Sequence, residues 1–174
     1  MDFANNYNGT ILIVNLDTGE TSNENLDEAM FDECLGGAAL NLKLYQQYAD
    51  RNPVILGTGL FTATFAPASC LGVATFKSPL NGGICHVPLT WQTGVELKLT
   101  GFDFVVLLGA SAKPVRLWLH DGLADVEDSA DVWGKSTWDT VDALRQIYGD
   151  DQVQVISIGP AGESKSALAQ VSES

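Results

Sequence analysis

The sequence has few basic residues. Only nine of its 174 residues are Lys or Arg, against 22 Asp or Glu, and the formal net charge at pH 7 is −13. Nucleic acids and anionic membrane surfaces are bound by clustered cations. We therefore expect neither of them among the partners. An acidity of this degree makes the chain soluble and self-repelling, and it carries no information about the fold.

Long hydrophobic runs are also missing. No stretch approaches the roughly 20 apolar residues of a membrane-spanning helix. The first six residues lack the basic stretch that precedes the apolar part of a signal peptide. We therefore expect a cytoplasmic protein. The length and the 45% hydrophobic content are those of a globular chain, so residues 1–174 are expected to form a single domain.

Cysteine is scarce and unpaired in its spacing. The sequence has three cysteines, Cys34, Cys70 and Cys85, and no two of them have C-x-x-C spacing. A disulfide framework and a cysteine-rich zinc or iron–sulfur site within this chain are therefore not expected. We expect buried free thiols.

Hydrophobic periodicity predicts strands and a few short helices. Apolar, β-branched runs predict strands at residues 11–16, 54–59, 72–76, 104–108, 114–119, 123–126 and 153–158. Helical spacing and cap residues predict helices at residues 27–35, 38–48, 94–99 and 136–148. Residues 77–83 and 159–163 are expected to be turns, and residues 164–174 have no clear period. Strands that pair mainly through hairpins indicate the α+β class, with mainly antiparallel or mixed sheets.

Six motifs resemble one protein family, in that family's order. They are the hairpin at 11–20, Leu35-Gly36-Gly37, the loop Thr75-Phe76-Lys77-Ser78-Pro79-Leu80-Asn81-Gly82-Gly83, Glu96-Leu97-Lys98 with Gly101-Phe102-Asp103, Val132-Trp133-Gly134-Lys135-Ser136-Thr137, and Ile158-Gly159-Pro160-Ala161-Gly162-Glu163. Over residues 8–170, the chain resembles the N-terminal domain of the tungsten-containing aldehyde:ferredoxin oxidoreductases. The family's activity is the ferredoxin-linked oxidation of aldehydes to carboxylates.

The resemblance implies an α+β module that forms a base under two pterin cofactors holding tungsten or molybdenum. If this chain keeps that site, the cofactor-binding residues implied are Lys77, Ser78, Gly82, Gly83, Gly159, Ala161 and Gly162. Backbone N–H groups of these two glycine-rich turns suit an anion. The turns have an equally simple structural explanation, since the fold itself requires their geometry.

Several positions depart from the family's pattern. An Arg that contacts the pterins is replaced by Leu71, an Asn near the bridging magnesium falls at Pro88 or a neighbour, and a cation after the last motif falls at about Ala167. The glycine-rich helix start also loses an Arg, because Ala38 and Ala39 follow Gly37. Pterin phosphates need charge-assisted hydrogen bonds that these side chains do not offer. We therefore expect no cofactor on this chain alone, with Leu71 and Trp91 packed into the space of the pterins.

Other candidate groups have structural interpretations. Cys85 and His86 are neighbours on an extended segment, so their side chains point to opposite faces and do not form a joint site. His120 is expected to be an exposed hairpin residue. A solvated face is expected for the acidic residues Asp121, Asp125, Glu127, Asp128 and Asp131, which lack the spacing of a calcium loop. Core or half-buried positions are expected for Trp118, Trp133 and Trp138.

Two functions follow from these observations. The first is a stand-alone binding or assembly module without its own tungsten–pterin site, which forms a homo-oligomer or contacts a partner subunit. The second is the cofactor-base subunit of a split tungsten or molybdenum oxidoreductase acting on aldehydes, which would carry the bis-pterin group. In both, we expect no catalytic residue and no metal ligand within this chain, which is not a complete enzyme by itself.

Overall fold

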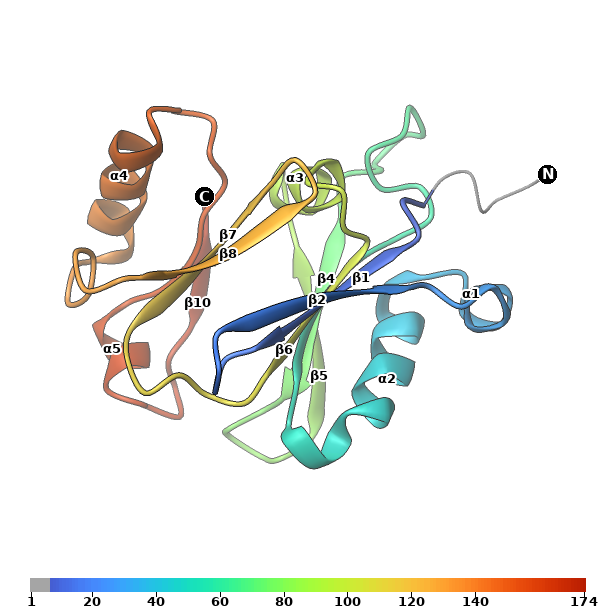
Figure 1. Cartoon of the computed structure of the whole chain (residues 1–174), viewed down its shortest axis with the longest axis horizontal. Coiled ribbons are helices and arrows are strands. Elements are labelled where there is room, and N and C mark those ends of the chain that lie inside the picture. The colour runs from blue at the N-terminus through green and yellow to red at the C-terminus, as the bar shows by residue number, and fades with distance from the viewer. Residues whose placement is uncertain (1–6) are drawn as a thin grey trace.

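The computed structural model describes residues 7–174 (Figure 1). Its strands are β1 (Thr10–Asn15), β2 (Glu20–Asn25), β3 (Val54–Thr58), β4 (Gly72–Lys77), β5 (Ile84–Leu89), β6 (Phe104–Leu108), β7 (Val115–His120), β8 (Leu123–Asp128), β9 (Ile156–Ile158) and β10 (Val171–Glu173). Its helices are α1 (Glu28–Cys34), α2 (Gly37–Gln47), α3 (Thr93–Leu99), α4 (Thr137–Tyr148) and α5 (Pro160–Glu163), with a 3-10 turn at Ala49–Arg51. The class is α+β, as predicted.

A six-stranded mixed sheet forms the centre, in the order β2-β1-β6-β3-β4-β5. Only β1 and β6 pair in parallel, and the other neighbours are antiparallel. Gly72 pairs with Thr58 on one side and Leu89 on the other. The loop between β3 and β4 and the junction between β5 and α3 therefore leave the sheet at the same end.

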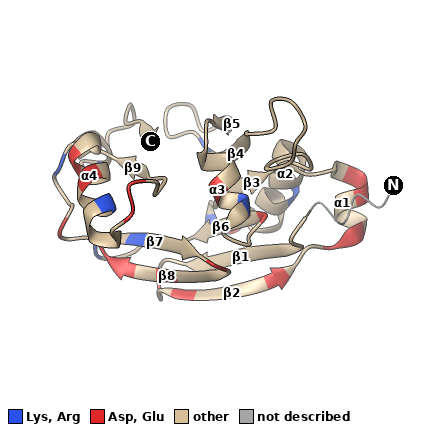
Figure 2. Ribbon diagram, turned by 90° about the horizontal axis from the view of Figure 1, so that it is seen from above, with Lys and Arg blue, Asp and Glu red and all other residues tan. Residues whose placement is uncertain are grey.

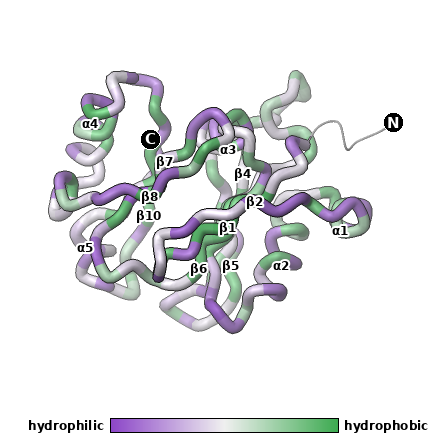
Figure 3. Tube along the Cα trace, viewed as in Figure 1, coloured by the Kyte–Doolittle hydropathy of each residue, from purple (hydrophilic) through white to green (hydrophobic). Residues whose placement is uncertain are grey.

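Alternation along β1 supplies both faces of the sheet. Ile11 and Ile13 pack in a cluster with α2, while Leu12 and Val14 pack in a second cluster that contains residues of α3, β7 and β8. This is the period of two that places successive side chains on opposite faces of a strand. Figure 3 shows the hydrophobic stretches of β1 and β6 in the middle of the molecule.

The C-terminal part has a small core of its own. Val132, Val141, Leu144 and Val155 form its buried cluster. Helix α4 begins at a Ser136 cap, whose hydroxyl accepts a hydrogen bond from the N–H of Asp139, and it ends at Gly149 in the left-handed region. Both features were predicted from the sequence. Strands β9 and β10 form a two-stranded sheet, and β7 and β8 form another.

Most predicted elements are confirmed, including both hairpins and the four helices. Two local predictions are wrong, because β9 begins at Ile156 instead of residue 153 and residues 160–163 form α5 instead of a simple turn. Two strands were not predicted: β5, in a segment expected only to be extended, and β10, in the tail without a clear period. Most strands pair antiparallel with their neighbours in the sequence, as predicted. The central pairings of β6 with β1 and β3 were not predicted. Such contacts between distant segments leave no mark in local periodicity.

Acidic residues are unevenly distributed over the described elements. Figure 2 shows acidic residues on α1, β2, β8 and α4, whereas the β3–β4 loop and β5 are free of them. Among the described residues, no helix has the length and apolar character needed to cross a membrane.

Candidate functional site

The residues predicted to bind the cofactor lie at separate places. Lys77 ends β4 and pairs with Ile84, whereas Leu71 precedes the first residue of the same strand. Six residues at about 3.3 Å each separate Lys77 from Leu71 by roughly 20 Å. No hydrogen bond or ion pair within residues 7–174 joins the 77–83 turn to the 159–163 segment.

The 77–83 turn uses most of its own N–H groups. Ser78 N donates to Gly83 O at 2.8 Å, and Gly82 N donates to Ser78 O at 2.9 Å. Leu80 N and Gly83 N donate to the side chains of Ser78 and Asn81 at 3.2 and 2.9 Å. An anion at this turn would therefore depend on the exposed Lys77 ammonium and the Ser78 hydroxyl more than on a backbone cradle.

The 159–163 segment is similarly engaged. Gly162 N and Glu163 N both donate to Gly159 O, at 2.8 and 3.1 Å. A Cβ added at Gly162 would lie 2.8 Å from the Cβ of Ile158, so this glycine allows α5 to pack on β9. Ala161 is exposed. That close approach gives the glycine a structural role, and the binding role of this segment stays a prediction.

Exposed hydrophobic side chains gather where the β3–β4 loop and the β5–α3 junction leave the sheet. We call this surface the apolar end and define it by Phe61, Phe65, Leu71 and Trp91, which are 54%, 109%, 49% and 82% exposed. A Cβ on Gly94 of α3 would lie 2.8 Å from the backbone carbon of Leu71, so the loop and the start of α3 are in contact.

The expectation that Leu71 and Trp91 fill a pocket is wrong. Leu71 is half exposed, and Trp91 projects into solvent from a backbone with φ of +50°. Pro88 lies on the edge strand β5, opposite Val73, and is exposed as well. The substituted positions therefore form an open, uncharged surface and not a packed core.

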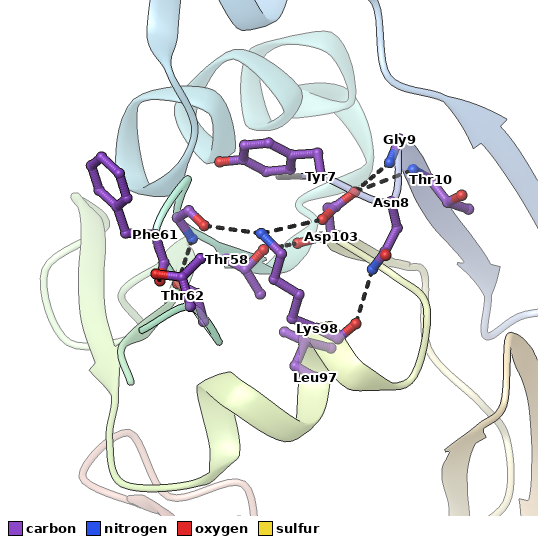
Figure 4. A network of polar contacts seen from close by, with 12 residues as sticks. Tyr7, Asn8, Gly9, Thr10, Thr58, Phe61, Thr62, Leu97, Lys98 and Asp103 are labelled. Carbon is purple, nitrogen blue, oxygen red and sulfur yellow. Dashed lines mark hydrogen bonds and ion pairs between the residues drawn. The ribbon is translucent and has the colours of Figure 1, made fainter. Parts of the chain in front are cut away.

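A buried polar network lies beneath the apolar end (Figure 4). The Lys98 ammonium is 3.3 Å from Gly59 O, 3.9 Å from the Asp103 carboxylate and 4.3 Å from the centre of the Tyr7 ring. Asp103 is fully buried, and its Oδ2 accepts from Gly9 N at 2.7 Å. Its Oδ1 has no hydrogen-bond partner among the described residues.

The network continues into the β3–β4 loop. Gly59 N donates to Thr62 Oγ1 at 2.9 Å, and that hydroxyl donates to Leu71 O at 2.7 Å. Both ends of the loop are thereby fixed through one side chain. Lys98 and Thr62 thus hold the backbone that presents the exposed Phe61 and Leu71.

Burial sets the electrostatics of this network. It lowers the pKa of Lys98, and the Asp103 carboxylate opposes that shift. Burial also raises the pKa of Asp103. The hydrogen bonds that its carboxylate accepts and the charge of Lys98 act in the opposite direction and lower it. Burial and the neighbouring Asp103 charge both raise the pKa of Tyr7. Lys98 is therefore an internal partner and not a free surface cation.

A second polar contact joins the C-terminal sheet to the β5–α3 junction. Thr90 N donates to both carboxylate oxygens of Glu173, at 2.9 and 3.0 Å, and Thr90 Oγ1 donates to Glu173 Oε1. Sequence reasoning missed this pair, because its members are 83 residues apart. It also assigned no role to Lys98 and Asp103, although their two motifs were recognised.

The cysteine and histidine expectations are partly confirmed. Cys34, Cys70 and Cys85 are free, but they are half-buried and not buried. On β5, His86 Nδ1 lies 2.9 Å from the hydroxyl of Thr75, its partner on β4, so it has a structural contact. His120 is half-buried instead of exposed, since it stacks on Trp118 and its Nε2 lies 3.1 Å from Asp125.

Several acidic residues around β8 take part in ion pairs. Arg116 binds Glu127 and Asp131 at 2.8 and 2.9 Å. Within the described part of the chain, no group of three metal-ligating side chains comes together.

The tryptophan prediction is confirmed only for Trp118, which is half-buried and stacks on Tyr148 at a 3.9 Å centroid distance. Trp133 and Trp138 are 48% and 80% exposed, so that expectation is wrong for both. Sequence spacing does not distinguish a tryptophan on the outer face of a helix from one in the core.

Comparison with known proteins identifies relatives over nearly the whole chain. The family model of the aldehyde ferredoxin oxidoreductase N-terminal domain matches residues 11–174. Tungsten-containing aldehyde ferredoxin oxidoreductases of Pyrococcus abyssi and Pyrococcus furiosus are 35% and 32% identical over 95% and 94% of this chain. An aliphatic sulfonate oxidoreductase, WOR-like subunit, of Pyrococcus furiosus is 24% identical. The chain spans 28% of the length of the two aldehyde oxidoreductases.

One solved structure has the same fold. The active site complex BamBC of benzoyl coenzyme A reductase, in complex with 1,5-dienoyl-CoA, matches with a TM-score of 0.91. The match covers 97% of this chain and 27% of that chain, at 23% sequence identity. An identity this low shows a common fold and nothing about substrate.

Proposed function

The chain belongs to the aldehyde ferredoxin oxidoreductase N-terminal domain family, and from this premise we propose that it acts as a binding or assembly domain of such an oxidoreductase, without a tungsten–pterin site of its own. The observation that carries this proposal is the apolar end. Hydrophobic side chains are exposed there, at positions where a site for cofactor phosphates would need cations and hydrogen-bond donors.

The side chains at this end do not fit a group with several phosphates. Leu71, Pro88 and Trp91 offer neither charge nor a row of donors, and both donors of Thr90 already bind the Glu173 carboxylate. The Lys98 ammonium is buried against Gly59 O. Phosphate recognition depends on accessible charge-assisted hydrogen bonds. The side chains at the apolar end either lack the donors for such bonds or already use them within the protein.

The same end suits contact with protein. Aromatic side chains are enriched at the centres of protein interfaces, and charged ones are depleted there. Residues 59–71 and 84–91 contain no Lys, Arg, Asp or Glu. Since the relatives are more than three times as long as this chain, we propose that the surface packs against the remaining domains of such an oxidoreductase, in the same chain or in a separate subunit.

A binding experiment tests this proposal. We expect Trp91→Ala to weaken association with those domains by about 30-fold, the effect of losing a central aromatic contact. Trp138→Ala is the matched control, because Trp138 is also 80% exposed but lies on α4. Equal affinities of Trp91→Ala and the unmodified chain, measured by titration calorimetry, would refute the assignment of the surface.

The second candidate function is the cofactor base of a split tungsten or molybdenum oxidoreductase acting on aldehydes. The exposure of Leu71 and Trp91 favours it. Because these side chains are not packed against the rest of the chain, a cofactor held by another chain could lie against the apolar end. Elemental analysis for tungsten and molybdenum in the complex purified from its native source tests this candidate. A clean negative result would exclude this candidate.

A further inference from the structure

Thr90 directs two hydrogen-bond donors at a single carboxylate. Its N–H lies 2.9 and 3.0 Å from the two oxygens of Glu173, and its hydroxyl donates to the first of them. Hydrogen bonds to an ionised acceptor are shorter and roughly twice as strong as neutral ones. A backbone N–H and a hydroxyl that converge on one oxyanion have the chemistry of an anion-binding position.

Two strands bring this carboxylate to the β5–α3 junction. Glu173 belongs to β10 and pairs with Ile156 of β9. Val155 N donates to Ser174 Oγ at 3.3 Å, and Ser174 N donates to Val155 O at 3.2 Å, which fixes the end of the strand. The Glu173 side chain is therefore held in place by the β9–β10 sheet.

We propose that Glu173 is a built-in ligand of an oxyanion position formed by the N–H and hydroxyl of Thr90, and that it keeps external phosphate out of this position. The contact gives the Glu173 carboxylate hydrogen-bond donors beside an uncharged surface, in a chain of net charge −13. This inference deepens the proposed function, since a closed position removes one anion site from the apolar end. It also predicts that the position opens when the carboxylate is removed.

The test compares Glu173→Ala with Asp151→Ala. Both variants lose one negative charge, but Asp151 is exposed and precedes β9. We expect the Thr90 amide to exchange its hydrogen about tenfold faster in Glu173→Ala, because its acceptor is gone. We also expect inorganic pyrophosphate to bind Glu173→Ala, measured by titration calorimetry, but neither the unmodified chain nor Asp151→Ala.

Two further variants keep the test decisive. Thr90→Val combined with Glu173→Ala should lose the acquired pyrophosphate binding, because the hydroxyl donor is removed. Glu173→Gln preserves the shape of the side chain if the alanine variant fails to fold, and it should show a smaller acceleration of Thr90 exchange in the same direction. Protection of the β6 amides reports whether each variant is folded.

The inference is overturned if the Thr90 amide exchanges equally in Glu173→Ala and Asp151→Ala, or if the unmodified chain already binds pyrophosphate through Thr90. Neither result affects the binding measurement on Trp91→Ala. Failure of this inference is therefore distinguishable from failure of the proposed function.

Discussion

At the scale of single residues, the exposure of Leu71 decides what a substitution there does. An arginine at an exposed position can extend its guanidinium into water, so no charge is buried. We expect Leu71→Arg to change the free energy of unfolding by less than about 0.5 kcal/mol. Thermal unfolding measures this, with Leu97→Ala as a buried control that should lose about 2–5 kcal/mol. A drop of several degrees in the Leu71→Arg melting temperature would show that this side chain is packed after all.

The burial of Lys98 predicts how the stability of the protein depends on pH. Burial lowers its pKa below the ordinary value of 10.5, so between the two values the unfolded chain binds more protons than the folded one. Stability from this group therefore rises with pH towards 10.5, as the cost of a buried ammonium is relieved. We expect the unmodified protein to gain stability relative to Lys98→Met as the pH is raised from about 7 to about 10, because the lowered pKa of Lys98 lies below its ordinary value of 10.5.

Urea denaturation across that range measures the difference. The upper limit avoids Tyr7, whose raised pKa makes the folded state lose stability only at more alkaline pH. A difference between the two proteins that stays constant with pH would contradict the placement of the Lys98 ammonium in a low-dielectric environment.

The sequence predicted which charged and polar groups are present or missing better than it predicted the burial and contacts of each side chain. The sequence indicated that a cation is missing at residue 71 and an amide at residue 88, but not that Leu71 and Trp91 are exposed. The motifs containing Lys98 and Asp103 were visible, yet their contact with the Gly59 carbonyl depends on how α3 lies under the β3–β4 loop. The Thr90–Glu173 pair had no local signal at all.

At the scale of secondary-structure elements, the packing of α3 on β4 depends on a glycine. A Cβ at Gly94 would lie 2.3 Å from Gly72 N and 2.7 Å from Cys70 O, both of them backbone atoms that cannot rotate away. We expect Gly94→Ala to destabilise the protein by about 1–3 kcal/mol, the usual effect of overpacking. Gly83→Ala is the control, since its nearest neighbour is the tip of the Asn81 side chain at 3.2 Å. Equal stability of the two variants would contradict the close approach.

Elements with strong local signals were predicted well. Helix α4 has its Ser136 cap, a hydrophobic face and a terminal glycine, and each was visible in the sequence. Strand β10 has only three residues and exists because it pairs with β9. Such a strand depends on its partner and not on its own composition, which explains why residues 164–174 gave no pattern.

At the scale of the whole molecule, the net charge opposes self-association through the apolar end. Two copies of a chain of charge −13 repel one another, and salt screens this repulsion over a Debye length of about 8 Å at physiological ionic strength. We expect the isolated chain to self-associate weakly through Phe61, Phe65 and Trp91, and more strongly as salt is added. Sedimentation velocity over a range of salt concentrations measures this. Association that decreases with salt would point to ion pairs instead of the apolar end.

The metal content of the assembled protein tests the central claim most directly. The claim is that this domain binds protein through its apolar end and holds no tungsten–pterin group. The protein is purified from its native source with whatever stays bound, and tungsten, molybdenum and pterin are measured per copy of this chain. We expect only background levels of all three on this chain after its partner is dissociated. Stoichiometric metal and pterin that remain with the chain would contradict the claim.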